Sequence, residues 1–201
     1  MLTGFAERAA AVTLLFILLP LIITAGLVIR VRSPGPLIIR SVRERRSGEH
    51  FEMLKIRTMH EDGPTRLEAA LACPDRLAEW QSHGRIRPDP RVIGRRAQWI
   101  RSASIDELPQ LWNIAKGEMA FVGPRPLPPE VAALLPARAR AIRRTVRPGL
   151  TGLWQVMGRD DLTLRQMAML DCFYVSRRSL GFDMIVLVRT IPAVLFARGA
   201  S

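Results

Sequence analysis

Cysteine and histidine are scarce in this sequence. Its 201 residues include two cysteines, Cys73 and Cys172, and three histidines, His50, His60 and His83. Two distant cysteines give no disulfide framework, and the spacing of these residues matches no metal site. We therefore expect a reduced body that faces the cytoplasm.

Lysine and aromatic residues are also few. The lysines are Lys55 and Lys116, so 28 of the 30 basic residues are arginines, and the net charge is +12. Arginine binds phosphate through two parallel hydrogen bonds, so this excess of arginine favours phosphorylated ligands, nucleic acid or an acidic membrane face as partners. Genomic base composition can produce the same excess of arginine. Aromatic residues make up 6% of the chain, which leaves little surface for stacking bases. Nucleic acid is therefore disfavoured as a partner, and the lack of a Walker or Rossmann glycine motif disfavours an ATPase or a dehydrogenase.

One stretch of 21 residues lacks charge altogether: residues 9–29, AAAVTLLFILLPLIITAGLVI. About 20 apolar residues suffice to span a bilayer as a helix. Pro20, near the middle, tends to kink or break a helix. Arg8 precedes the run and Arg30 and Arg32 follow it, which is compatible with a hairpin that enters and leaves by the cytoplasmic face. A single kinked span is the alternative, because transmembrane helices tolerate proline.

Residues 33–201 are expected to form one α+β catalytic domain, small and irregular in build. RSPGPLIIR (32–40) and FEMLKIRTM (51–59) are typical of strands, 60–84 and 161–180 of helices, and RPGLTGLWQV (147–156) of a turn followed by a strand. The apolar segment 179–197 is interrupted by charges and a proline. It suits an amphipathic helix in the membrane interface or a helix packed in the core.

The stretch SIDELPQLWN (104–113) raises a choice between structure and chemistry. Ser104 and Glu107 have the spacing of a capping box, which would explain Asp106 and Glu107 as residues that start a helix. Pro109 argues against this cap, because it would occupy the fifth helical position and remove a backbone donor. Asp106 and Glu107 therefore remain candidates for catalysis.

Two arginines lie in loops that are suited to binding an anion. In FVGPRPLPP (121–129), Pro124 and Pro126 hold Arg125 on a stiff loop, and VRPGLTG presents Arg147 in a similar way. A plain turn is the alternative. Carboxylates beside gripped phosphates imply a divalent ion, and Mg²⁺ suits oxygen ligands of this kind.

Three further residues belong to predicted elements. Lys55 and Arg57 lie on the same side of the strand 51–59. Asp171 falls on the apolar stripe of the helix 161–180, so it needs a partner, either an arginine or a cation of the site. A structural ion pair explains Asp171 without any role in binding.

Taken together, the motifs resemble those of the monotopic phosphoglycosyl transferases, which are bacterial sugar transferases. The similar stretches are SPGP, FEMLKIRTM, DPRVIGRRAQWIRSASIDELPQLWNIAKGEMAFVGPRP, RPGLTGLWQVMGR and DCFYVSRRSLGFD, in this order over nearly the whole chain. The family often has Ser-Pro at its membrane break, where this chain has Leu19-Pro20 and so lacks a serine hydroxyl that satisfies freed backbone groups. We expect this chain to belong to the minimal catalytic form, without the additional N-terminal membrane helices of the larger members.

The resemblance implies an enzyme that moves a phosphosugar from a UDP-sugar to undecaprenyl phosphate at the cytoplasmic face of the bacterial inner membrane. It implies Asp106 as the nucleophile and a ligand of Mg²⁺, with Glu107 beside it, and a re-entrant helix over residues 1–32 broken near Pro20 that contacts phospholipid. The implied substrate-binding residues are Lys55, Arg57, Arg91, Pro124, Arg125, Pro126, Arg147, Gln155, Arg159 and Asp171. A catalytically inactive anchor is the rival reading, although both acids and the Pro-Arg-Pro motif are intact. The identity of the sugar and a homodimeric state are left open.

Overall fold

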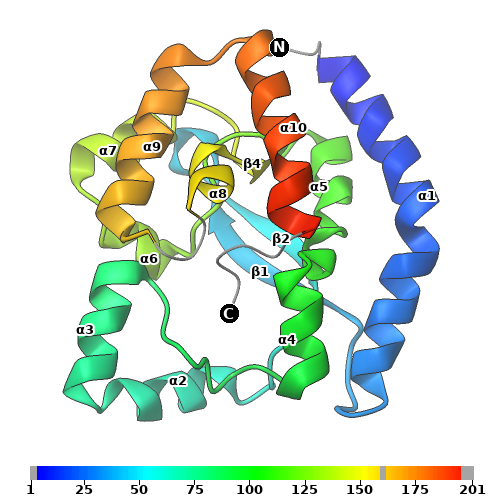
Figure 1. Cartoon of the computed structure of the whole chain (residues 1–201), viewed down its shortest axis with the longest axis vertical. Helices are drawn as coiled ribbons and strands as arrows, with labels where there is room; N and C mark the ends of the chain where they lie inside the picture. The colour runs from blue at the N-terminus through cyan, green and yellow to red at the C-terminus, as the bar shows by residue number, and fades with distance from the viewer. Residues whose placement is uncertain (1–3, 159–161, 196–201) are drawn as a thin grey trace.

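The computed structural model describes residues 4–158 and 162–195. A long N-terminal helix, α1, lies along one side of a body that carries two small sheets and the remaining helices (Figure 1). The elements of the body are β1 Ile38–Glu44, β2 His50–Ile56, α2 Gly63–Leu71, α3 Pro74–His83, α4 Gly94–Ser102, α5 Gln110–Lys116, β3 Ala120–Val122, α6 Pro129–Ala133, α7 Ala137–Arg143, β4 Gly149–Thr151, α8 Leu153–Met157, α9 Leu164–Arg177 and α10 Leu180–Leu195, with 3₁₀ turns η1 Arg46–Gly48 and η2 Ile105–Glu107. The predicted mixed α/β class is confirmed.

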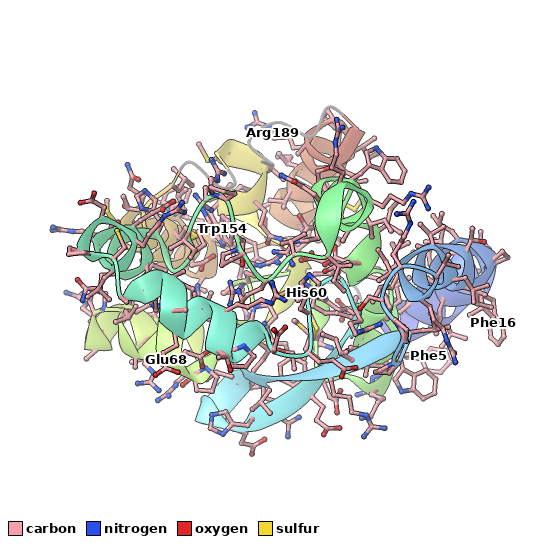
Figure 2. The ribbon with its side chains drawn as sticks, turned by 90° about the horizontal axis from the view of Figure 1, so that it is seen from below. Phe5, Phe16, His60, Glu68, Trp154 and Arg189 are labelled. Carbon is pink, nitrogen blue, oxygen red and sulfur yellow. The ribbon has the colours of Figure 1, made fainter. Side chains whose placement is uncertain are left out.

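Helix α1, Gly4–Arg30, is long and apolar enough to cross a membrane. Ala11, Ile22 and Ile29 pack into the body, whereas Phe16 projects from the outer side of the helix (Figure 2). The structure differs here from the expected helix–break–helix, because α1 continues through Pro20. A proline removes one backbone hydrogen bond, but the other hydrogen bonds of α1 and its packing against the body remain. The helix therefore continues and bows around the body (Figure 1).

Strands β1 and β2 form an antiparallel hairpin in which Ile38 pairs with Ile56 and Glu44 with His50. The strand predicted over 51–59 is confirmed as far as Ile56, where β2 ends. β1 is longer than expected and continues into the basic stretch after Arg40. Phe51 and Met53 point from β2 into a core shared with α1 and α5. This packing fixes the face of β2 that also carries Lys55.

The C-terminal third surrounds a parallel pair, β3 and β4. The strand predicted over RPGLTGLWQV ends at Thr151, and the residues after Gly152 form α8, which buries Leu153 and Trp154. Helix α9 begins at a capping box made by Thr163 and Gln166. Helix α10 has two apolar faces, of which one enters the core and the other is exposed.

Candidate active site

The two adjacent acids lie in η2, in front of α5 and outside it. Asp106 is 2% exposed and Glu107 is 9% exposed. The capping-box interpretation was wrong, because Ser104 has a left-handed backbone (φ 56°) and its side chain makes no cap hydrogen bond. Pro109 is the residue before the first turn of α5, where its missing N–H costs no helical hydrogen bond. The acids are therefore not needed to start the long helix that the local pattern suggested.

Lys55 comes to these acids from strand β2. Its Nζ lies 3.1 Å from Oδ2 of Asp106 and 3.6 Å from Oε1 of Glu107. Adjacent buried carboxylates repel each other, and a cation between them offsets this repulsion. The hairpin thus brings one of the two lysines of the chain into contact with both acids.

Arg125 contacts Glu107 from the Pro124-Arg125-Pro126 loop. Its Nη1 donates to Oε2 of Glu107 at 3.1 Å, and its Nη2 donates to Oε1. Burial alone would raise the pKa of Glu107, but the charges of Arg125 and Lys55 outweigh burial and lower this pKa to about 2. Glu107 is thus ionised at neutral pH and holds the two cations beside Asp106.

Arg43 is a member of this group that the sequence did not single out. It pairs across the hairpin with Phe51, so it lies on the same face of the sheet as Lys55. Its Nε is buried and has no hydrogen-bond partner within the described parts of the chain. Burial and the nearby charge of Arg125 lower the pKa of Arg43 to about 10, against the opposing effects of Glu130 and Glu107. No sequence signal distinguishes it, because it is one arginine among 28.

Several predicted binding residues are engaged elsewhere. Arg57 is 3% exposed and donates to the carbonyls of Ser33 and Pro36, in the segment after α1. Arg147 pairs with Glu7 of α1 at 2.5 Å and donates to the carbonyl of Met119. Both arginines therefore fasten α1 and the segment after it to the body.

Two other predicted residues, Arg91 and Gln155, make contacts within the body. Arg91 makes a bidentate ion pair with Asp89 and lies over the ring of Trp80. Its charge also contributes to the environment of Arg43. Gln155 donates from Nε2 to the carbonyl of Leu150 at 3.2 Å.

Asp171 and Arg159 complete the predicted set. Asp171 is 1% exposed and forms an ion pair with Arg143, the kind of partner expected for a carboxylate on an apolar stripe. Arg143 is a second residue that the sequence did not single out. Arg159 lies outside the described residues.

The two acids provide only part of the ligands that a magnesium ion needs. The described residues contain no group of three or more histidine, cysteine or acidic side chains that could form a closed metal site. Mg²⁺ is usually held by one or two carboxylates, by water and by substrate phosphates. Asp106 beside a bound diphosphate fits that pattern, so the donor set suits a metal that arrives with its substrate.

Comparison with known proteins identifies the family of this chain. A profile described as bacterial sugar transferase matches residues 1–197. The chain belongs to the bacterial sugar transferase family. The match confirms the family inferred from the motifs, and with it that the protein is an enzyme, a phosphoglycosyl transferase.

Named relatives cover almost all of the chain. The exopolysaccharide production protein ExoY of Rhizobium meliloti (strain 1021) is 38% identical over 98% of this chain and 88% of its own length. A UDP-glucose:undecaprenyl-phosphate glucose-1-phosphate transferase of Caulobacter vibrioides is 40% identical over 93% of this chain and 66% of its own length. The UDP-galactose-lipid carrier transferase of Erwinia amylovora is 37% identical over 96% of this chain and 40% of its own length. This sugar transferase thus resembles both relatives of its own size and the parts of longer ones.

Proposed function

We propose that this sugar transferase moves a phosphosugar from a UDP-sugar to a polyprenyl phosphate in two displacements through Asp106. The observation that carries the proposal is the buried pair Asp106 and Glu107, contacted by Lys55 from one side and by Arg125 from another. A nucleophile that attacks a diphosphate approaches an anion, so cations must surround it. The names of the relatives, which specify undecaprenyl phosphate and UDP-sugars, favour the same donor and acceptor.

In the first displacement, a carboxylate oxygen of Asp106 attacks the phosphorus that bears the sugar. The bond from that phosphorus to the bridging oxygen breaks, and UMP leaves with the electron pair. Arg125 and Lys55 hold the phosphate oxygens, and Arg43, on the same face of the sheet as Lys55, adds a positive charge near Glu107. Asp106 and the phosphates would hold Mg²⁺, which would neutralise part of the diphosphate charge.

In the second displacement, an oxygen of the polyprenyl phosphate attacks the same phosphorus. The acyl-phosphate bond to Asp106 breaks, which restores the carboxylate and releases polyprenyl-diphosphate sugar. One set of cations can serve both steps, because the phosphate of the sugar stays beside Asp106 throughout. Glu107 positions Arg125 and Lys55 for both displacements.

The membrane arrangement is part of the proposal. Both ends of α1 are fastened to the same body, the start through Glu7 and Arg147 and the following segment through Ser33 and Arg57. A helix that crossed a bilayer would carry its two ends to opposite sides, so these contacts favour a helix that is held at the membrane with both of its ends on the cytoplasmic side. Large apolar side chains are exposed on α1, α4, α5 and α10, as lipid contact requires; they include Phe16, Ile17, Trp99, Trp112, Ile185 and Val188.

The test is turnover by the full chain in detergent with Mg²⁺, undecaprenyl phosphate and a panel of UDP-sugars. We expect one donor to give UMP and a lipid-linked sugar diphosphate in equal amounts, and Asp106→Asn to give neither. Absence of a lipid product with every donor tested would contradict the proposal.

A further inference from the structure

The loop that carries Arg125 is held in place by its carbonyl groups. Apart from the Gly123 N–H, which donates to the carbonyl of Thr151 at 2.9 Å, this loop has fewer backbone donors than most loops, because Pro124 and Pro126 have no N–H. Four carbonyls accept hydrogen bonds instead: Val122 from the Tyr174 hydroxyl at 3.2 Å, Pro124 from the Gly149 N–H at 3.0 Å, Arg125 from Nη2 of Arg143 at 2.5 Å, and Leu127 from the Glu44 N–H at 3.3 Å. The position of the Arg125 side chain therefore depends on donors from elsewhere in the fold.

Two of these four donors are side chains, and both are supported by α9. Arg143 belongs to α7, which packs against α9, and its Nη1 donates to Oδ2 of Asp171. Tyr174 lies one turn after Asp171 on the same helix face, and it also contacts Asp183 through its hydroxyl at 2.6 Å. Asp171 and Tyr174 are 1% and 3% exposed, so both act from within the protein core.

The guanidinium of Arg143 is suited to this link. One nitrogen faces Asp171 and the next faces the carbonyl of Arg125, so a single planar group joins α9 to the loop. Burial lowers the pKa of Arg143 to about 10, which still leaves it charged at neutral pH. A lysine at this position has one terminal nitrogen at the end of a flexible chain and cannot reproduce the fork.

We propose that Arg143, held by Asp171, is a positioning residue for Arg125, and that Tyr174 supports the other end of the loop. Arg143 fixes the backbone of Arg125 so that its side chain meets Glu107 and the phosphates of the donor. This inference rests on the proposed function, in which Arg125 binds donor phosphate.

A double-mutant cycle tests the link. In the wild-type background, Arg143→Lys lowers kcat/KM for the UDP-sugar about tenfold, the effect of weakening one charged hydrogen bond. In an Arg125→Ala background, the same change has almost no effect on kcat/KM, because the side chain that it positions is gone. A merely structural role would give the same loss in both backgrounds, and that additive result would overturn the proposal. Arg138→Lys, an exposed arginine on the same helix, is the matched control.

Hydrogen exchange provides a readout that needs no turnover. In peptides that cover residues 121–127, Arg143→Lys raises amide exchange, whereas Arg138→Lys does not. If Arg143→Lys fails to fold, Asp171→Asn, which keeps the shape of the side chain, replaces it and gives the same local increase. Unchanged exchange in a folded variant contradicts the positioning role. Increased exchange in a chain that turns over no donor would leave the positioning role intact and remove the proposed function.

Discussion

Lys55 of β2 contacts both members of the acid pair, with Nζ 3.1 Å from Asp106 and 3.6 Å from Glu107. The lysine and the acids are about 50 positions apart in the sequence, so the fold of the hairpin against η2 creates this contact. Asp106 and Glu107 can lie side by side in a buried position because Lys55 and Arg125 supply two positive charges.

Removal of the Lys55 charge should therefore abolish most of the activity. We expect Lys55→Met to lower kcat by about 10²–10³, the range found when one preorganised electrostatic contact is lost. The other lysine offers a matched control, because Lys116 is half-exposed and pairs with Glu118 away from the acids. Lys116→Met should retain at least about half of the wild-type rate of UMP release. Equal activity of the two variants would contradict the placement of Lys55 in the site.

The lowered pKa of Glu107 predicts a pH dependence of stability. The carboxyl of Glu107 has a pKa near 2 in the folded state and an ordinary pKa in the unfolded state. It therefore stabilises the fold at any pH above its unfolded pKa, and this contribution is lost as the pH falls toward 2. We expect Glu107→Gln to have a lower thermal midpoint than wild type at neutral pH. The difference between the two midpoints should shrink as the pH is lowered from about 5 to about 3.

The measurement is thermal unfolding of both proteins in the same detergent across that range. Glu68→Gln, an exposed glutamate on α2, controls for the loss of a surface charge (Figure 2). A difference between wild type and Glu107→Gln that stays constant with pH would show that Glu107 does not carry the effect.

The proposed placement of both ends of α1 on the cytoplasmic side predicts where these ends are accessible. In a background of Cys73→Ser and Cys172→Ser, we expect Ala6→Cys and Val31→Cys both to react with a membrane-impermeant maleimide in inverted vesicles and not in intact spheroplasts. Both positions are exposed in the structure. Ile17→Cys, on the exposed middle of α1, should be protected by lipid in both preparations. Labelling of the two ends from opposite sides would show a crossing helix.

Local patterns predicted most of the elements, and Pro109 correctly indicated that Ser104 does not cap a helix. Thr163 and Gln166 form a capping box, whereas Ser104 and Glu107, with the same spacing, do not. The difference lies in the backbone, because Ser104 is left-handed and Pro109 forces the helix to begin later. Spacing alone does not contain this information.

The contacts of the site were harder to predict than its residues. The motifs identified Asp106, Glu107, Lys55 and Arg125, but only the fold shows that they meet. Arg43 and Arg143 were missed, since an arginine-rich chain gives no local reason to choose them among 28. Their importance depends on long-range partners across a hairpin and between two helices.

The central claim is that Asp106 becomes covalently attached to the phosphosugar. The most direct test is the intact mass of the detergent-solubilised protein after mixing with Mg²⁺ and each UDP-sugar, in the absence of a lipid acceptor. We predict a mass gain of one sugar phosphate with the correct donor, absent in Asp106→Asn and discharged when polyprenyl phosphate is added. Turnover with lipid acceptor but no adduct from the same donor would instead indicate direct transfer, and would contradict the role of Asp106 as the nucleophile.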